Sequence, residues 1–275
     1  MSRLGYHLCI RLRDRGVIAR DAVERRLVAR AVLRHGKEAG LHSFALPDTH
    51  LHMGQLGGHM APGELCRRVE ITLTKQLGLK VGFEMLTPIP IRDQAHLEQV
   101  ARYILTQHVR HQVAADPFRE STNLPDILGL RVIGGDYSLN NLRSVLPRLT
   151  YETVLAWLGA QGLPSLSEPL LLERLERAKV ALGAETLATT LREAGLRAAC
   201  LPDLLGSRPL VVATRRALIE VAGNCLPPRL LALALGIDPG SLTWLRRRPA
   251  RPELVKAIRL QLCLEDLISK GRSAA

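Results

Sequence analysis

Two histidines in one alternating segment have the types and spacing that could do chemistry. His50-Leu51-His52 lies within Thr49–Leu56, a stretch that predicts a strand. Side chains two positions apart on a strand share a face, so both imidazoles point one way while Leu51 points into the core. Two imidazoles on one face can bind a single divalent metal ion. Such pairs also occur as surface or hydrogen-bonded histidines, so this motif alone leaves both interpretations open.

Tyr103 and Gln107 could complete such a site. They lie in ARYILTQHVRHQ, which predicts a helix, and residues four apart on a helix share a face. Phenols ionise near pH 10, so a tyrosine that attacks a phosphodiester at neutral pH needs a cation beside it. The Gln107 carbonyl could supply a neutral oxygen ligand to a metal. The alternative is that Tyr103 packs in the core with its hydroxyl group satisfied.

The elements that must position these residues predict an α+β domain over residues 1–131. Their order is β-α-β-β-α-β followed by a helix, which is the ferredoxin-like split βαβ arrangement of an antiparallel sheet with helices on one face. In the first helix, Val23 and Leu27 belong to the stripe expected to face the core, with arginines opposite. The expected strands are Tyr6–Arg13, Leu41–Leu46, Thr49–Leu56 and Phe83–Ile91, and the helices are Asp21–Ala39, Pro62–Leu77 and Asp93–Arg110.

The remainder of the chain predicts helices. Residues 132–209, with short helices expected at Leu170–Leu182 and Glu185–Gly195, form a helical linker or subdomain of unknown role. Residues 210–275 form an all-α region in which two short helices joined by a glycine-bearing turn predict a helix-turn-helix. Its expected helices are Thr214–Gly223, capped by Thr214, then Pro228–Gly236, a helix that begins at Ser241, and Glu253–Lys270.

The composition favours a polyanionic partner. Lys and Arg number 38 against 26 Asp and Glu, a formal net charge of +12, which attracts nucleic acid or an anionic membrane. No apolar stretch approaches the ~20 residues of a spanning helix, and the N-terminus lacks a signal-peptide core, so we expect no membrane partner. The cysteines fit neither a disulfide framework nor a CxxC zinc site, and they predict small core residues in a reducing cytoplasm. They are Cys9, Cys66, Cys200, Cys225 and Cys263.

The motifs taken together resemble a known family. LPDTHLH on the third expected strand, followed by RYILTQ on a helix, resembles the HUH-superfamily single-tyrosine transposases, and in particular the REP-associated tyrosine transposases. Tyr6-His7 and the stretch Asp116–Arg131 add shorter matches, and the likeness covers residues 1–131. Two departures are Thr49, where an Asn is usual before the first histidine, and Gln107-His108, where Asn-Pro is usual.

The resemblance implies a DNA transposase-like single-strand endonuclease and strand transferase. His50, His52 and Gln107 would hold Mg²⁺ or Mn²⁺ against the scissile phosphate, and Tyr103 would attack it. The product would be a 5′-phosphotyrosine, which a free 3′-OH could later resolve. The expected partner is single-stranded hairpin DNA, with duplex DNA as a further candidate for the C-terminal helices, and the protein would be a monomer or a homodimer.

Basic residues on two expected helices are candidates for DNA contact. A solvated face explains those on the second helix equally. The triple arginine of the recognition helix is the better basic patch, although such runs also occur on solvated helix ends. His108 and His111 could bind phosphate or face solvent, and Tyr137 and Tyr151 lie outside the matched region and are not expected to be nucleophiles. The DNA-contact candidates are Arg67, Arg68 and Lys75 on the second helix, and Ser241, Thr243, Trp244, Arg246, Arg247 and Arg248 on the recognition helix.

Two other functions fit part of the pattern. A catalytically inactive, host-adopted DNA-binding regulator would keep the fold and use the helix-turn-helix, and replacing Tyr103 by Phe would leave its effect unchanged. A small-molecule metalloenzyme built on His50 and His52 would need a third histidine or a carboxylate nearby. Such an enzyme would have no need of a net charge of +12. The first of these is the main alternative to the nuclease.

Overall fold

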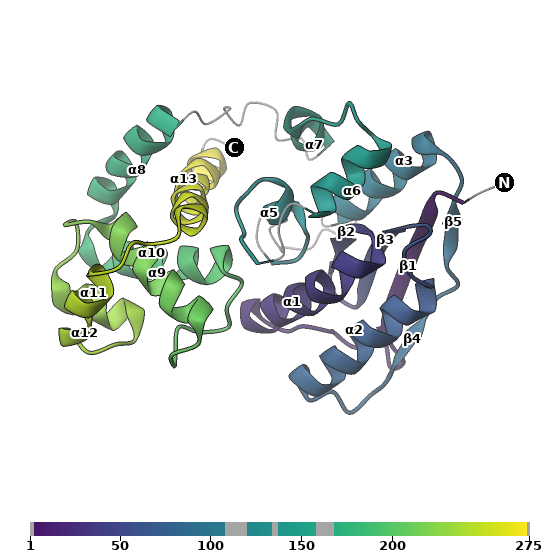
Figure 1. Ribbon diagram of the computed structural model, residues 1–275, viewed down its shortest axis with the longest axis horizontal. Coiled ribbons are helices and arrows are strands. Elements are labelled where there is room, and N and C mark those ends of the chain that lie inside the picture. The colour runs from purple at the N-terminus through teal and green to yellow at the C-terminus, as the bar shows by residue number, and fades with distance from the viewer. Residues whose placement is uncertain (1–2, 108–119, 134–136, 158–167, 274–275) are drawn as a thin grey trace. The chain divides into compact units, whose positions relative to one another are not determined.

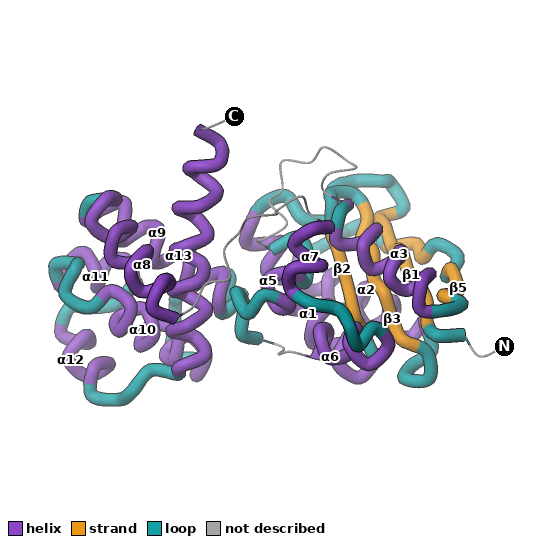
Figure 2. The backbone as a smooth tube through the Cα atoms, turned by 90° about the horizontal axis from the view of Figure 1, so that it is seen from above, coloured by secondary structure: helices purple, strands orange, loops and turns teal. Residues whose placement is uncertain are grey.

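The computed structural model describes residues 3–107, 120–133, 137–157 and 168–273, and it is an α+β protein with an open antiparallel sheet (Figure 1). This confirms the predicted fold class. The chain forms two compact units, one of residues 1–128 and 133–161 and one of residues 129–132 and 162–275. All strands belong to the first unit, and the described part of the second contains only helices and loops (Figure 2).

The sheet has the strand order β2-β3-β1-β4, and β5 also pairs with β1. Every pairing is antiparallel, so β3 lies between β2 and β1 with its direction reversed. The segment with two prolines forms the short strands at one edge, where the missing N–H of Pro90 is tolerated. The strands are β1 (Gly5–Leu12), β2 (Leu41–Ala45), β3 (His50–Leu56), β4 (Phe83–Met85) and β5 (Ile89–Ile91).

Two helices, α1 (Ala22–Ala39) and α2 (Pro62–Leu77), pack against one another and against the strands (Figure 1). The Asp21 side chain caps α1 by accepting from the Glu24 N–H. Gly40 ends α1 with a φ of 68°, a conformation that glycine adopts without strain. Both ends of α1 therefore agree with the prediction from sequence.

The buried face of α1 differs from the predicted stripe. Val23 is 41% exposed, whereas Arg26 is only 2% exposed. The cause is a partner distant in the sequence, because Arg26 Nε donates to Glu120 Oε1 at 2.8 Å. A buried guanidinium needs such a carboxylate, so the ion pair turns an arginine toward the interior and Val23 toward solvent.

The segment after residue 120 covers the edge of β2. The Asn123 side chain accepts from the Phe44 N–H at 2.9 Å and donates to the His42 carbonyl at 3.1 Å. These bonds satisfy strand groups that an edge strand otherwise leaves open. Four helices near this edge contribute to one apolar cluster. They are α3 (Gln94–Leu105), α5 (Leu124–Ile127), α6 (Tyr137–Val145) and α7 (Tyr151–Trp157).

The second unit has a core that draws on all of its described helices. The helices are α8 (Glu168–Leu182), α9 (Ala184–Ala198), α10 (Pro209–Ala222), α11 (Pro228–Leu235), α12 (Gly240–Arg246) and α13 (Pro252–Ser273). Buried residues from each of them form one cluster, including Leu175, Leu187, Leu218, Leu231, Leu242 and Ile258. Helices α8 and α9 thus share a core with the C-terminal helices.

The predicted start of α10 is wrong. The helix begins at Pro209, and Thr214 is a buried interior residue whose Oγ1 donates to the Leu210 carbonyl at 2.8 Å. Threonine hydroxyls make this bond to the residue four positions earlier as readily as they cap a helix, and proline suits the first helical turn. The end of α11 agrees with the prediction, since Gly236 has a φ of 63°.

Three cysteines are buried, Cys66, Cys200 and Cys263, but Cys225 is exposed in the loop after α10, so the expectation that all five are core residues is wrong. All five are free thiols. Of the helices in the described ranges, none combines the length and the apolar character needed to cross a membrane.

Candidate functional site

The register of β1 against β3 gathers histidines on one face of the sheet. Cys9 lies opposite His52 and His7 opposite Gly54, and directly paired residues project from the same face. The ring centroids of His50 and His52 are 4.6 Å apart and their planes are nearly perpendicular. Leu51, between them, is fully buried. The two imidazoles of the motif and that of His7 therefore lie together.

One ring nitrogen of each motif histidine faces a polar neighbour. His52 Nδ1 lies 3.0 Å from His7 Nε2, and His50 Nδ1 lies 3.2 Å from Thr49 Oγ1. A hydrogen bond at Nδ1 fixes the tautomer and orients Nε2 as the ligating atom, as is usual for metal-binding histidines. The threonine that departs from the family pattern thus supplies a polar contact to His50.

Helix α3 brings Tyr103 to the same face. The Tyr103 ring lies edge-on to His52, with centroids 5.7 Å apart, and edge-on to His7 at 5.6 Å. Asp93 caps the start of α3 by accepting from the His96 N–H, which fixes where the helix begins. Gln107, beyond the end of α3, is buried and its Nε2 donates to the Tyr103 carbonyl at 3.0 Å.

Burial keeps three titratable groups near the motif uncharged at neutral pH. Desolvation lowers the pKa of His7 to about 4, with repulsion from His96 adding to the effect. Desolvation likewise lowers the pKa of His42 to about 3, and His7 contributes. Burial raises the pKa of the Cys9 thiol to about 11. At neutral pH His7 and His42 are neutral and Cys9 is a thiol rather than a thiolate.

Gly54 is required beside these histidines. A register shift between Leu41 and Ser43 inserts one extra residue, His42, into β2. A Cβ atom at Gly54 would lie 2.3 Å from His42 Cε1, which is closer than real contacts allow. Glycine in a strand interior often marks such a close approach. The bulge and the glycine together let the His42 ring lie close to Gly54, the residue opposite His7.

Comparisons with known proteins give this chain no relatives. No family model matches it, and neither the curated proteins nor the solved structures contain a match.

The donors available for a metal are neutral. Within the described ranges, no group of three or more His, Cys, Asp and Glu side chains is arranged to hold a metal ion. The set expected from the sequence is of another kind, two imidazoles and an amide. Imidazole suits Mn²⁺ better than Mg²⁺, and an amide oxygen suits both. The structure brings His50 and His52 together, and Gln107 is buried beyond the end of α3. A divalent ion held there would take its remaining ligands from water or from a phosphate.

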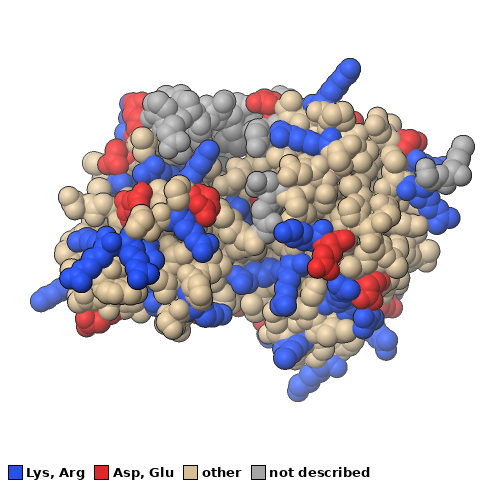
Figure 3. Space-filling model, in the orientation of Figure 1, with Lys and Arg blue, Asp and Glu red and all other residues tan. Residues whose placement is uncertain are grey.

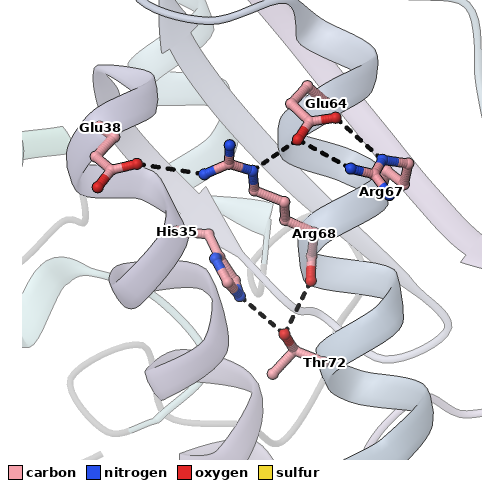
Figure 4. A network of polar contacts seen from close by, with 6 residues as sticks. All are labelled: His35, Glu38, Glu64, Arg67, Arg68 and Thr72. Carbon is pink, nitrogen blue, oxygen red and sulfur yellow. Dashed lines mark hydrogen bonds and ion pairs between the residues drawn. The ribbon is translucent and has the colours of Figure 1, made fainter.

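Two of the three basic candidates on α2 are already paired with carboxylates. Arg67 and Arg68 both donate to Glu64, and Arg68 also reaches Glu38 (Figure 4). The hydrogen bonds from Arg67 and Arg68 lower the pKa of Glu64 to about 2, so the carboxylate stays ionised. Lys75, further along α2, is exposed. Of these three, Lys75 is the best placed to meet a phosphate without losing an ion pair.

The candidates on α12 and directly after its end are all exposed. Leu242 and Leu245 anchor the helix in the core of the second unit. The exposed candidates are Ser241, Thr243, Trp244, Arg246, Arg247 and Arg248. Lys and Arg side chains are also abundant over the face of the molecule shown in Figure 3.

Two candidates were missed in the sequence, and a third was given no role. His42 has no motif spacing that links it to His50, and Arg216 carries no signal beyond its charge. His7 contributed to the resemblance, but no spacing indicated its contact with His52. Tyr137 has a structural role, since its hydroxyl donates to the Leu33 carbonyl at 2.8 Å. The structure does not describe His108, His111, residues 116–119 of the matched stretch or the side chain of Tyr151.

Proposed function

We propose that this chain cleaves single-stranded DNA through a covalent tyrosine intermediate. Tyr103 is the nucleophile, and His50, His52 and Gln107 would hold Mg²⁺ or Mn²⁺. The observation that carries the proposal is the edge-on contact of the Tyr103 ring with His52, 5.7 Å between centroids, on the face that also holds His50.

The reaction exchanges one phosphoester for another. The Tyr103 oxygen attacks phosphorus, the bond from phosphorus to the 3′ oxygen breaks, and the 5′ end remains joined to tyrosine. The phenolic proton is lost to solvent, and the leaving oxygen takes up a proton to become a 3′-OH. Because a phosphodiester is conserved, attack by a 3′-OH can reverse the step and join strands.

A divalent ion on the histidines would supply Lewis-acid stabilisation of the charge that develops on the phosphate. The chain's own residues prepare the site for it. His7 holds His52 through Nδ1, and Thr49 holds His50 in the same way. The neutral donor set leaves the full positive charge of the ion available to the scissile phosphate.

Two features of the fold support the same proposal. The order β2-β3-β1-β4, with α1 and α2 packed together, is the order expected of a ferredoxin-like split βαβ domain. In the second unit, α11 and α12 are joined by a short turn that begins with Gly236, as in a helix-turn-helix. We propose that these helices make a second contact with DNA.

A gel assay tests the nuclease. The protein is incubated with Mn²⁺ or Mg²⁺ and a labelled DNA hairpin with single-stranded flanks, and is then denatured in SDS. We expect a labelled adduct that is lost in Tyr103→Phe while DNA binding is retained. Tyr137→Phe is the matched control, because this hydroxyl bonds the Leu33 carbonyl, and it should keep the adduct.

Two results would contradict the proposal. An adduct that persists in Tyr103→Phe would assign the nucleophile elsewhere. No adduct with the wild-type protein, under conditions in which it binds DNA and His50→Ala with His52→Ala binds equally, would favour the non-catalytic regulator.

A further inference from the structure

The second unit carries a group of arginines that pair with no carboxylate among the described residues. Two adjoining hollows, of about 330 and 280 Å³, share Arg216, Arg248 and Pro249 in their walls. Arg251 lines one hollow and Arg246 the other. We call Arg216, Arg246, Arg248 and Arg251 the arginine groove.

The charge of the arginine groove is open to a ligand. Within the described part of the chain, none of its four arginines has an ion pair. The single acidic residue in its walls is Glu220, so four positive charges face one negative charge. By contrast, Arg67 and Arg68 share Glu64. Uncompensated arginines along a groove attract a polyanion, and the more so at low salt.

Arg216 joins the arginine groove to an exposed aromatic ring. Its Cζ lies 5.4 Å from the centroid of the Trp244 ring, and its Nε is buried with no hydrogen-bond acceptor among the described residues. Trp244 is 53% exposed, which is unusual for so large an apolar side chain. The guanidinium backs the indole on one side and leaves exposed ring surface beside the groove.

We propose that the arginine groove and Trp244 form a binding site for single-stranded DNA. The arginines contact successive phosphates, and an unpaired base stacks on the indole. An aromatic platform next to a basic groove is how proteins hold single strands without sequence preference. Paired bases stack within a duplex and offer no face to Trp244, and an acidic peptide would satisfy the arginines but not the indole.

This inference deepens the second DNA contact of the proposed function, and it can be tested apart from cleavage. Binding is measured by fluorescence anisotropy in EDTA with the Tyr103→Phe protein, so neither the metal nor the nucleophile takes part. The probes are a labelled oligothymidylate of about 15 nucleotides and a duplex of equal length. A competition with polyglutamate measures simple attraction to negative charge.

Trp244→Ala should weaken binding to the single strand about 10-fold, while Trp244→Phe keeps a stacking ring and most of the affinity. Arg216→Ala combined with Arg248→Ala should weaken binding and make its salt dependence shallower, by about 0.7 for each phosphate that the variant no longer neutralises. Arg177→Ala is the matched control in the same unit, because Arg177 is exposed and paired with Glu173, and it should bind as the parent does.

A spectroscopic signal separates stacking from mere charge. The chain has two tryptophans, so Trp157→Phe leaves Trp244 as the reporter. We expect the single strand to quench its fluorescence and the duplex of equal length to quench it less. Unchanged affinity in Trp244→Ala, tighter binding of the duplex, or equal competition by polyglutamate would each overturn the proposal, and all three leave the nuclease test unaffected.

Discussion

His7 Nε2 lies 3.0 Å from His52 Nδ1, although 45 residues separate the two along the chain. Because the pKa of His7 is lowered to about 4, this histidine is neutral at pH 7. Its Nε2 can therefore accept a hydrogen bond from the N–H at His52 Nδ1. His52 then presents Nε2 as a lone-pair donor, which is the form that binds a metal. The contact therefore assigns His7 a positioning role toward the proposed ligand.

Replacing His7 should weaken metal binding without removing a ligand. In His7→Phe, His52 loses the acceptor at Nδ1, and Mn²⁺ affinity should fall about 10- to 100-fold, the usual cost of losing such a partner. His7→Gln keeps an amide oxygen that can accept the same proton, so it should restore most of the affinity. Titration with Mn²⁺ by calorimetry measures both. Wild-type affinity in His7→Phe, with an unchanged melting temperature, would refute the positioning role.

Local patterns were enough to predict the elements that carry the site. Alternation in Thr49–Leu56 predicts β3 and the shared face of His50 and His52, because the strand period is a property of the backbone itself. Asp21 and Asp93 indicate where α1 and α3 begin, because a helix start needs an acceptor for its open N–H groups. Both kinds of signal lie within a few residues of what they predict.

The parts that could not be predicted depend on partners far along the chain. The burial of Arg26 depends on Glu120, 94 residues away. His42 comes close to Gly54 only because a bulge in β2 changes the alternation. His7 lies beside His52 only through the register of β1 against β3. A shift of one residue in either register would send these side chains to the opposite face.

Metal and DNA should bind cooperatively. The proposed ligands His50, His52 and Gln107 are neutral, so a divalent ion held by them keeps its charge. A DNA phosphate that becomes a further ligand should therefore strengthen binding of the ion. We expect single-stranded DNA to raise Mn²⁺ affinity by roughly 5- to 150-fold, the usual range of coupling between two sites. The Tyr103→Phe protein prevents covalent reaction, and Mn²⁺ paramagnetic resonance reports the free ion.

The control for this coupling is His50→Ala with His52→Ala, in which DNA should raise Mn²⁺ binding only as far as the DNA binds the ion itself. Coupling of the same size in that variant would show that the ion sits elsewhere.

Stability of the first unit should decrease in mild acid because of His42. A histidine whose pKa is lowered on folding takes up its proton more readily in the unfolded chain. The contribution of neutral His42 to stability is complete above pH ~6.5, which is the pKa of histidine in the unfolded chain. It is lost progressively as the pH falls toward about 3, the pKa of His42 in the folded protein. Between pH 7 and pH 5, His42 should account for about 2 kcal/mol of the free energy of unfolding.

Urea denaturation in EDTA at the two pH values measures this loss. His42→Leu, which removes the titrating group at similar volume, should show a pH-dependent decrease that is about 2 kcal/mol smaller than in the wild type. His7 retains its own lowered pKa in that variant, so part of the decrease should remain. An identical decrease in both proteins would rule out His42 as its source.

The Arg26–Glu120 pair should be the ion pair whose loss the first unit tolerates least. Both side chains are almost fully buried, at 2% and 6% exposure. Glu120→Gln removes the carboxylate charge beside Arg26 Nε, and breaking a buried ion pair in this way should cost about 3–5 kcal/mol in the free energy of unfolding. Urea denaturation followed by circular dichroism measures the cost. The matched control in the same unit is Arg20→Ala, whose side chain is 77% exposed where it pairs with Glu24, and this variant should unfold at nearly the wild-type midpoint.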